Sequence, residues 1–227
     1  IDGPDPHGGP THSARVASLA AEIGRRLKLP AVTCERLYVA GLLHDVGKQV
    51  ISQDILEKRG ELTEEERRQV QQHPVAAGEL LAHIPFPWGD VAEIVRHHHE
   101  RLDGRGYPDR LRGEQISIEA RILAMAESFD AMTSDQPWRP RLALPKIVAQ
   151  ISENLGIQLE PRIVQALCDA VETGLDARSD PPEFAAHLAS AFDPHLIRRM
   201  LRELRRQLSQ PSQQPARIID ATPAGMS

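Results

Sequence analysis

Apolar residues recur at helical spacing along most of the chain. The first run spans residues 12–27, and its apolar face consists of Val16, Leu19, Ala20, Ile23 and Leu27. His12 lies at the inner edge of this face, where an imidazole needs a polar partner. Similar spacing predicts helices over 144–154 and 161–172. Because the apolar-polar alternation typical of strands is absent from the sequence, the pattern predicts an all-α fold.

Helix start signals divide this pattern into separate elements. Thr33 is predicted to cap a second helix that runs into His44-Asp45-Val46-Gly47-Lys48. In such a helix His44 and Lys48 share one face, because they are four residues apart, and Asp45 lies about 100° round from His44.

Three further signals fall in the middle of the chain. Thr63 is predicted to start a helix with a capping box. Pro74 disfavours the α conformation at His73, which predicts a break there and a new helix from Pro74. Ser117 is predicted to begin a helix with a long apolar face.

Three consecutive histidines form the most unusual stretch of the sequence. Asp90 is predicted to cap a helix whose last turn contains His97-His98-His99, and a glycine-rich loop follows at 101–116. Histidine is the commonest metal ligand. The residues alone leave open which two of the three histidines bind a metal.

The pattern also suggests how the chain is organised. Residues 1–11 are predicted to be a linker, 12–172 a compact helical unit, 173–208 a helical extension and 209–227 a disordered tail. The arginine-rich amphipathic helix at 197–208 is interpreted as docking on its own domain or on a second copy in a homodimer. Because the chain begins with Ile, an upstream sensor or receiver domain is also compatible with it.

Composition narrows the functional classes. The 227 residues are 41% hydrophobic and 26% charged, as in an ordinary globular protein. The formal net charge of −5 argues against a general DNA- or RNA-binding protein. No apolar run reaches membrane-spanning length, and the two cysteines, Cys34 and Cys168, lie in apolar helical patterns. A cytoplasmic location with reduced thiols is therefore predicted.

Imidazoles and carboxylates at helix ends and inward faces form the candidate metal ligands. They are His12, His44, Asp45, His73, His98, His99 and Glu127. This set favours iron or manganese and leaves zinc, nickel and cobalt open. Seven groups exceed one tetrahedral site, so two ions sharing a carboxylate are predicted, an arrangement suited to phosphate-ester hydrolysis. The remaining histidines are interpreted as ordinary surface or packing residues: His7, His83, His97, His187 and His195.

Several spaced motifs then carry a family resemblance. His44-Asp45, His73-Pro74, His98-His99-Glu100 and the loop Asp103-Gly104-Arg105-Gly106-Tyr107-Pro108 together resemble an HD-GYP domain, from about Thr11 to about Val171. The resemblance implies a helical HD-domain bundle with a catalytic domain over 12–172. It also implies a metal-dependent phosphodiesterase that hydrolyses cyclic di-GMP to linear pGpG with a hydroxide bridging two metals, and it leaves open whether pGpG or GMP is the final product.

The resemblance also implies a role for each site residue. One metal would be held by His12, His44, Asp45 and Glu127, and the other by Asp45, His73, His98 and His99. Asp45 would be the bridging ligand and Lys48 would face the scissile phosphate, so these two are the predicted catalytic residues. The predicted substrate-binding residues are Lys48, Asp103, Gly106, Tyr107, Pro108 and Arg139.

The sequence departs from the family pattern at four positions. Glu127 replaces the usual aspartate, and Gly8 replaces a glutamate of members with three metals, which favours two metals here. Gln136 and Trp138 replace an arginine and a tyrosine on the substrate side. Two alternatives therefore accompany the enzyme: a catalytically weak cyclic di-GMP receptor or partner-binding module, and a phosphohydrolase for another cyclic dinucleotide.

Overall fold

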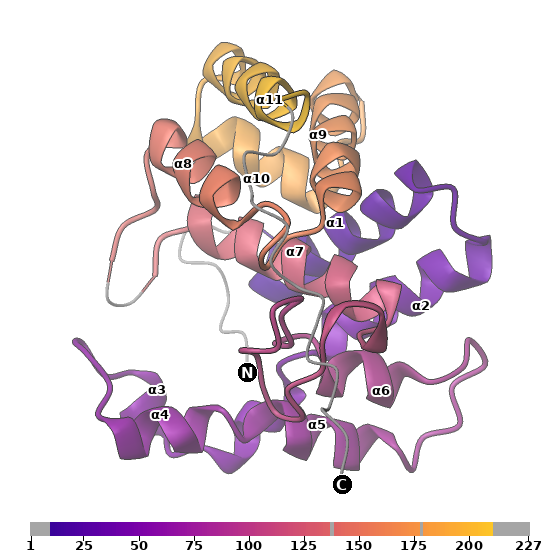
Figure 1. Ribbon diagram of the computed structural model, residues 1–227, viewed down its shortest axis with the longest axis vertical. Coiled ribbons are helices and arrows are strands. Elements are labelled where there is room, and N and C mark those ends of the chain that lie inside the picture. Colours follow the sequence, from indigo (N-terminus) through magenta and orange to yellow (C-terminus); the bar gives the residue numbers. More distant parts are fainter. Residues whose placement is uncertain (1–9, 137–138, 178, 211–227) are drawn as a thin grey trace, which may run out of the picture.

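The computed structural model describes residues 10–136, 139–177 and 179–210, and these fold into a bundle of helices (Figure 1). The only β pairing within these ranges consists of two isolated bridges, Gln136 with Arg139 and Leu155 with Leu159. The prediction of an all-α fold is therefore confirmed.

The helical elements follow one another along the chain with short connections. They are α1 (His12–Arg26), α2 (Ala31–Leu43), the 3-10 helix η1 (Val46–Val50), α3 (Gln53–Leu56), α4 (Glu64–Val70), α5 (His73–Leu81), α6 (Val91–Arg96), the 3-10 helix η2 (Gly113–Gln115), α7 (Ile118–Thr133), α8 (Leu144–Asn154), α9 (Pro161–Asp176), α10 (Glu183–Ala191) and α11 (Pro194–Leu208).

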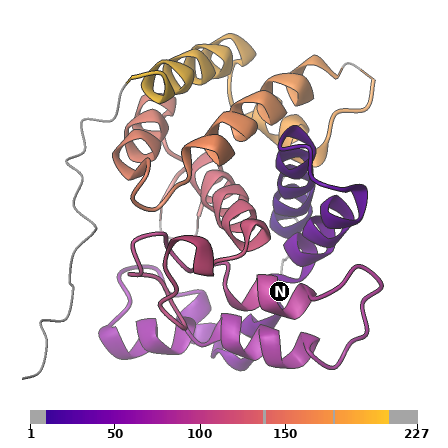
Figure 2. The ribbon, with the colours of Figure 1, turned by 45° about the vertical axis from the view of Figure 1, so that its right-hand side comes forward.

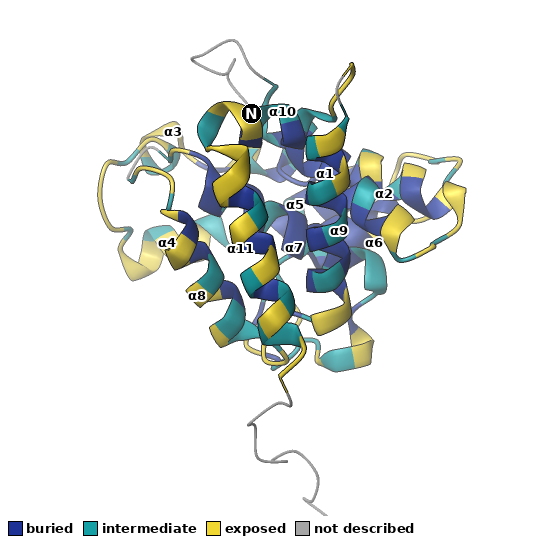
Figure 3. Ribbon diagram, turned by 90° about the horizontal axis from the view of Figure 1, so that it is seen from above, coloured by how far each residue is buried: buried dark blue, intermediate teal, exposed yellow. Residues whose placement is uncertain are grey.

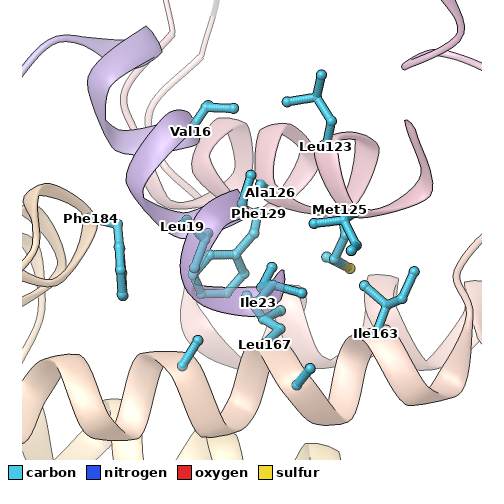
Figure 4. Close-up of a cluster of buried hydrophobic side chains, with 14 of the residues drawn as sticks. Val16, Leu19, Ile23, Leu123, Met125, Ala126, Phe129, Ile163, Leu167 and Phe184 are labelled. Carbon is cyan, nitrogen blue, oxygen red and sulfur yellow. The ribbon is translucent and has the colours of Figure 1, made fainter. Parts of the chain in front are cut away.

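Helix α7 runs through the centre of the bundle and packs against α1, α2, α6, α9 and α10. In Figures 1 and 2, α3 to α6 lie at one end of the molecule and α8 to α11 at the other. The core between them joins Leu19 and Ile23 of α1, Phe129 of α7, and Ile163 and Leu167 of α9, all at most 1% exposed (Figure 4). Burial of such side chains stabilises the fold by roughly 1.5–3 kcal/mol each.

The helix starts follow the sequence signals in three cases and differ in one. The side chains of Thr63, Asp90 and Ser117 each accept a hydrogen bond from the main chain of the helix they precede, and Thr63 forms a complete capping box. The prediction for Thr33 is wrong, because α2 already begins at Ala31. The carbonyl oxygen of Pro30 accepts from the amide of Thr33, so the helical hydrogen bonds start before that residue.

The triple histidine lies just beyond a helix, not in its last turn as predicted. Helix α6 ends at Arg96, and His97, with φ −106° and ψ 11°, is its C-cap. His98 and His99 occupy the turn that follows. The predicted break near Pro74 is present, since α4 ends at Val70, but His73 is already the first residue of α5.

The two C-terminal helices pack on the rest of the bundle. Helix α10 contacts α1, α7 and α9, and α11 contacts α8 and α9. Figure 3 shows exposed and buried residues along α11, as expected for an amphipathic helix docked on its own domain. Its buried residues are Ile197, Met200, Leu201 and Leu204. The predicted boundaries between the compact unit and the helical extension, at residue 172, and between the extension and the tail, at residue 208, remain predictions.

Some predictions fall on residues outside the described ranges. These include residues 1–9 of the linker, residues 211–227 of the tail, and Trp138. Among the described helices, none is long and apolar enough to cross a membrane.

Candidate metal centre

A first cluster of ligand atoms forms where α1 begins and α2 ends. Thr11 caps α1, so His12 is the first residue of that helix, while His44 is the C-cap of α2 and Asp45 follows it. Ligand atoms of His12, His44 and Asp45 lie within 4.8 Å of one another. Asp45 Oδ2 is 3.9 Å from His12 Nε2 and 3.5 Å from His44 Nε2.

A second cluster forms where α5 begins and α6 ends. Ligand atoms of His73, His98 and His99 also lie within 4.8 Å of one another. Asp45 Oδ1 is 3.7 Å from His73 Nε2. One carboxylate therefore faces both clusters, with Oδ2 toward the first and Oδ1 toward the second.

Gly47 allows Asp45 to come this close to α5. A Cβ atom at position 47 would lie 2.0 Å from the carbonyl oxygen of His73 and 2.6 Å from the amide nitrogen of Ala77. Only glycine fits between η1 and α5 at this approach. The sequence His-Asp-Val-Gly-Lys thus places a glycine where the two clusters meet.

Most of the imidazoles in the clusters are oriented by a hydrogen bond at Nδ1. Three of them bond through Nδ1 to a carbonyl oxygen three residues earlier. These bonds join His44 to Gly41 (2.8 Å), His73 to Val70 (2.7 Å) and His98 to Val95. A carbonyl oxygen can only accept, so Nδ1 carries the proton and Nε2 has a lone pair directed into the site.

His12 is oriented by a side chain instead. Its Nδ1 is 2.7 Å from Asp130 Oδ2, and Arg15 Nε donates to Asp130 Oδ1 at 2.7 Å. Burial favours the neutral acid, but the hydrogen bonds from His12 and Arg15 outweigh it and hold the pKa of Asp130 at about 2. This role of Asp130 was not predicted from the sequence.

Burial sets the charge state of the second cluster. It lowers the pKa of His73, and it lowers the pKa values of His98 and His99 well below the usual range. These imidazoles are therefore neutral at neutral pH. Burial also opposes charge on His12, yet the hydrogen bond and charge of Asp130 raise its pKa.

Two buried polar atoms in the clusters lack a partner. His44 Nε2 and Asp45 Oδ1 have no hydrogen bond to any described residue. Burial disfavours the Asp45 carboxylate, but its electrostatic interactions with His44 and Lys48 outweigh this and lower its pKa. An ionised carboxylate and an unpaired imidazole nitrogen are costly to bury alone and are the groups a divalent cation binds. The residues present therefore fit a metal site.

Glu127 of α7 lies beside the second cluster. Its Oε2 is 3.8 Å from His98 Nε2 and its Oε1 is 3.8 Å from His99 Nε2. The family resemblance implied that Glu127 binds a metal together with His12 and His44. The closest described histidine contacts of Glu127 are with the second cluster, so its place in the first site stays a prediction.

Lys48 and Tyr107, two of the predicted substrate-side residues, adjoin the clusters. Lys48 Nζ donates to Asp45 Oδ2 at 2.6 Å, while about a third of the lysine side chain remains exposed. The Tyr107 ring stacks on His99 with centroids 4.8 Å apart. Burial, with the charges of Glu127 and Asp45, raises the pKa of the Tyr107 hydroxyl, which is therefore protonated at neutral pH.

The other predicted substrate-side residues shape the loop or bond to the main chain. Asp103 accepts from the Arg101 guanidinium and from the amide of Arg105. Gly106 allows a close turn, because a Cβ there would lie 2.5 Å from the Cα of Glu100. Pro108 follows Tyr107 through a cis peptide bond. The guanidinium of Arg139 bonds to the carbonyl oxygens of Ala131 (2.7 Å) and Pro140 (3.1 Å).

Glu100 and His97 hold this loop in place, although neither role was predicted. Glu100 accepts from the amides of Asp109 (2.6 Å) and Leu111 (3.1 Å). His97 Nε2 is 2.8 Å from Asp109 Oδ2. His97 therefore supports the loop, and it lies outside the two groups of candidate ligands.

A cavity of about 330 Å³ adjoins the second cluster. Its walls combine ligand-cluster residues with side chains able to donate hydrogen bonds. They include His98, His99, Tyr107, Glu127, Arg101 and Gln158. The cavity offers space for part of a substrate next to the candidate ligands.

Comparison with known proteins gives a consistent result. A family model described as HD domain matches residues 5–163. The chain is 36% identical over 160 residues to cyclic di-GMP phosphodiesterase PA4108 of Pseudomonas aeruginosa, covering 70% of this chain and 38% of that protein. It is 38% identical over 160 residues to 3′3′-cGAMP-specific phosphodiesterase 3 of Vibrio cholerae, covering 70% of this chain and 35% of that protein. The chain thus spans less than half the length of these curated relatives.

A solved structure confirms the fold. The HDG"Y"P protein Bd1817 from Bdellovibrio bacteriovorus resembles this structure with a TM-score of 0.59 and 18% sequence identity. The likeness covers 71% of this chain and 51% of that chain. At this identity it bears on the arrangement of helices alone.

Proposed function

Since the chain belongs to the HD domain family, as its motifs predicted, we propose that it is a metal-dependent phosphodiesterase that hydrolyses cyclic di-GMP to linear pGpG. The observation that carries the proposal is Asp45, whose two oxygens face separate histidine clusters 3.5 to 3.9 Å away. The names of the relatives from Pseudomonas aeruginosa and Vibrio cholerae support a cyclic dinucleotide as the substrate class.

The two clusters are the proposed metal sites, with iron or manganese as the preferred ions for this ligand set. His12, His44 and Asp45 would hold one ion, and Asp45 together with His73, His98 and His99 would hold the other. Glu127, which stands at the motif position where the family usually has an aspartate, would supply a further carboxylate. When bound, two such ions lower the pKa of water to make a nucleophile and stabilise charge on phosphoryl oxygens.

The chain's own side chains bind and orient the substrate around these sites. The ammonium of Lys48, held 2.6 Å from Asp45 and partly exposed, is placed to stabilise negative charge that develops on the phosphate. The protonated Tyr107 hydroxyl can donate to the substrate while its ring packs on His99. The bulk of the dinucleotide then lies toward the cavity beside His99.

A turnover assay tests this proposal directly. Protein purified without oxygen and loaded with Fe²⁺ or Mn²⁺ should convert cyclic di-GMP to pGpG, as measured by separating the nucleotides by chromatography. Asp45→Ala should abolish turnover because it removes the ligand common to both sites, whereas Asp54→Ala, at an exposed position on α3, should leave it unchanged. Full turnover by Asp45→Ala would contradict the mechanism.

A second substrate is favoured by one comparison. The Vibrio cholerae relative is named as specific for 3′3′-cGAMP and is as similar to this chain as the cyclic di-GMP relative. The two dinucleotides should therefore be compared at equal metal loading. Faster cleavage of 3′3′-cGAMP would reassign the substrate, and tight binding of either dinucleotide without cleavage would instead indicate a receptor.

A further inference from the structure

His187 of α10 is connected to the candidate ligand His12 through two polar side chains of the α7 region. His187 Nε2 lies 3.1 Å from Ser134 Oγ, and Ser134 Oγ donates to Asp130 Oδ2 at 3.4 Å. Asp130 Oδ2 lies 2.7 Å from His12 Nδ1. Helix α10 follows the residues 5–163 that match the family model, so the connection brings a segment beyond that match to the metal centre.

The hydrogen-bonding capacity of Ser134 gives this connection a direction. A hydroxyl has one proton to donate and two lone pairs that accept. His187 Nε2 also lies 3.4 Å from the carbonyl oxygen of Thr133, which can only accept, so we assign the proton of the imidazole to Nε2, facing Ser134 Oγ. Arg15 donates to Ser134 Oγ at 3.2 Å as well, so the serine proton is left for the Asp130 carboxylate. Asp130 thereby accepts from Ser134 as well as from Arg15 and His12.

The surroundings make this arrangement sensitive to the loss of a donor. Asp130 is 3% exposed and Ser134 is 6% exposed. Hydrogen bonds to a charged group are strong in such an environment, and an unmatched acceptor is costly there. Helix α10 is also anchored to α1, since the amide of Phe184 donates to Ser18 Oγ at 3.4 Å.

We propose that His187 is a positioning residue for the metal site that contains His12. It directs the Ser134 hydroxyl toward Asp130, which in turn holds the imidazole of His12 with Nε2 facing Asp45. The inference rests on the proposed metal-dependent function. From the sequence His187 was interpreted as an ordinary histidine, because nothing in its local sequence shows that α10 folds back on the end of α7.

Calorimetric titration of the full metal-free chain with Mn²⁺ tests this role without an activity assay. His187→Ala should weaken Mn²⁺ binding at the site that contains His12 about three- to tenfold. Removing a group that hydrogen-bonds a metal ligand directly usually costs about 10- to 100-fold, and His187 acts one step further away. The other step, at His73, His98 and His99, should be unchanged. His187→Gln should restore binding because its amide can donate to Ser134, and His195→Ala, at an exposed histidine of α11, should match the wild type.

A double-mutant cycle separates positioning from general damage to the fold. Ser134→Ala should weaken the same step, and adding His187→Ala should cause little further loss, because both changes break one pathway. If the wild type binds two Mn²⁺ ions, any of three results would overturn this inference alone. These are equal weakening of both binding steps, additive losses in the double variant, and unchanged Mn²⁺ binding by His187→Ala. A wild type that binds no Mn²⁺ would overturn the proposed function and this inference with it.

Discussion

The two candidate metal sites share Asp45 but are supported in different ways. His73 and His98 of the second site are held by carbonyl oxygens three residues earlier in the chain. His12 of the first site is held by Asp130, which lies 118 residues away in sequence and is itself paired with Arg15. His44 of the first site is also held by a main-chain carbonyl oxygen, that of Gly41. The second site therefore depends on local main-chain geometry, whereas the first depends in addition, through His12, on packing between α1, α7 and α10.

This difference predicts which site tolerates change. A main-chain acceptor survives any substitution that keeps the backbone in place. A side-chain acceptor is lost with a single substitution, and the buried groups that donated to it are then left unpaired. We expect the first site to be the more easily weakened by mutations that touch no metal ligand.

The largest expected effect is the loss of a ligand from either site. His12→Ala and His98→Ala should each reduce the number of ions from two to one per chain, measured by elemental analysis. Turnover should fall by more than about 100-fold, which is the upper end of the effect of removing a group that only hydrogen-bonds a metal ligand. His97→Ala is the matched control from the triple histidine and should retain two ions. Loss of an ion in that variant would show that the register of the ligands is wrong.

A smaller but selective effect is expected for Asp130→Asn. The amide cannot accept as a carboxylate does from both His12 and Arg15, so Mn²⁺ affinity at the first site should fall about 10- to 100-fold. The second site should be unaffected. Because the Asp130 pKa of about 2 lies below its usual 3.8, the carboxylate also stabilises the fold by about 2 kcal/mol above pH 4.

Chemical denaturation checks that stabilisation in the metal-free protein at pH 7. Asp135→Asn, at an exposed aspartate near the end of α7, serves as the control and should unfold like the wild type. Equal Mn²⁺ affinities for both sites in Asp130→Asn would remove the proposed contrast between them.

A weaker effect is expected from pH on the metal-free protein. The pKa values of His98 and His99 are lowered by burial, so the unfolded chain binds more protons than the folded one below about pH 6.5. The contribution of these two groups to stability should thus be complete above that pH and fall as the pH drops through it. Urea unfolding with a chelator present at pH 7.5 and 5.5 measures the change, and His98→Gln combined with His99→Gln should reduce it. If the double variant loses as much stability between pH 7.5 and 5.5 as the wild type, the groups responsible for the pH dependence are other than His98 and His99.

The sequence predicted the features that depend on local spacing. Apolar periodicity identified the long helices, and the caps at Thr63, Asp90 and Ser117 were read from neighbouring residues. Motif spacing also brought together His44 with Asp45 and His98 with His99. These features are encoded within a few residues, so no knowledge of the tertiary fold was needed.

Features that depend on distant contacts were not predicted. The roles of Asp130 and His187 arise from contacts between α1, α7 and α10, which no sequence spacing reveals. The incorrect cap at Thr33 has a different cause, because Pro30 begins the helical hydrogen bonds without any side-chain cap. Glu100 was similarly missed, since its two acceptor bonds reach 9 and 11 residues along a folded loop.

The central claim is that Asp45 joins two metal sites through one carboxylate. Electron paramagnetic resonance of the chain loaded with two equivalents of Mn²⁺ tests it most directly, because ions sharing a bridging ligand are magnetically coupled. The expected result is the spectrum of an exchange-coupled Mn²⁺ pair in the wild type. A spectrum of two isolated Mn²⁺ ions, or of a single bound ion, would contradict the account.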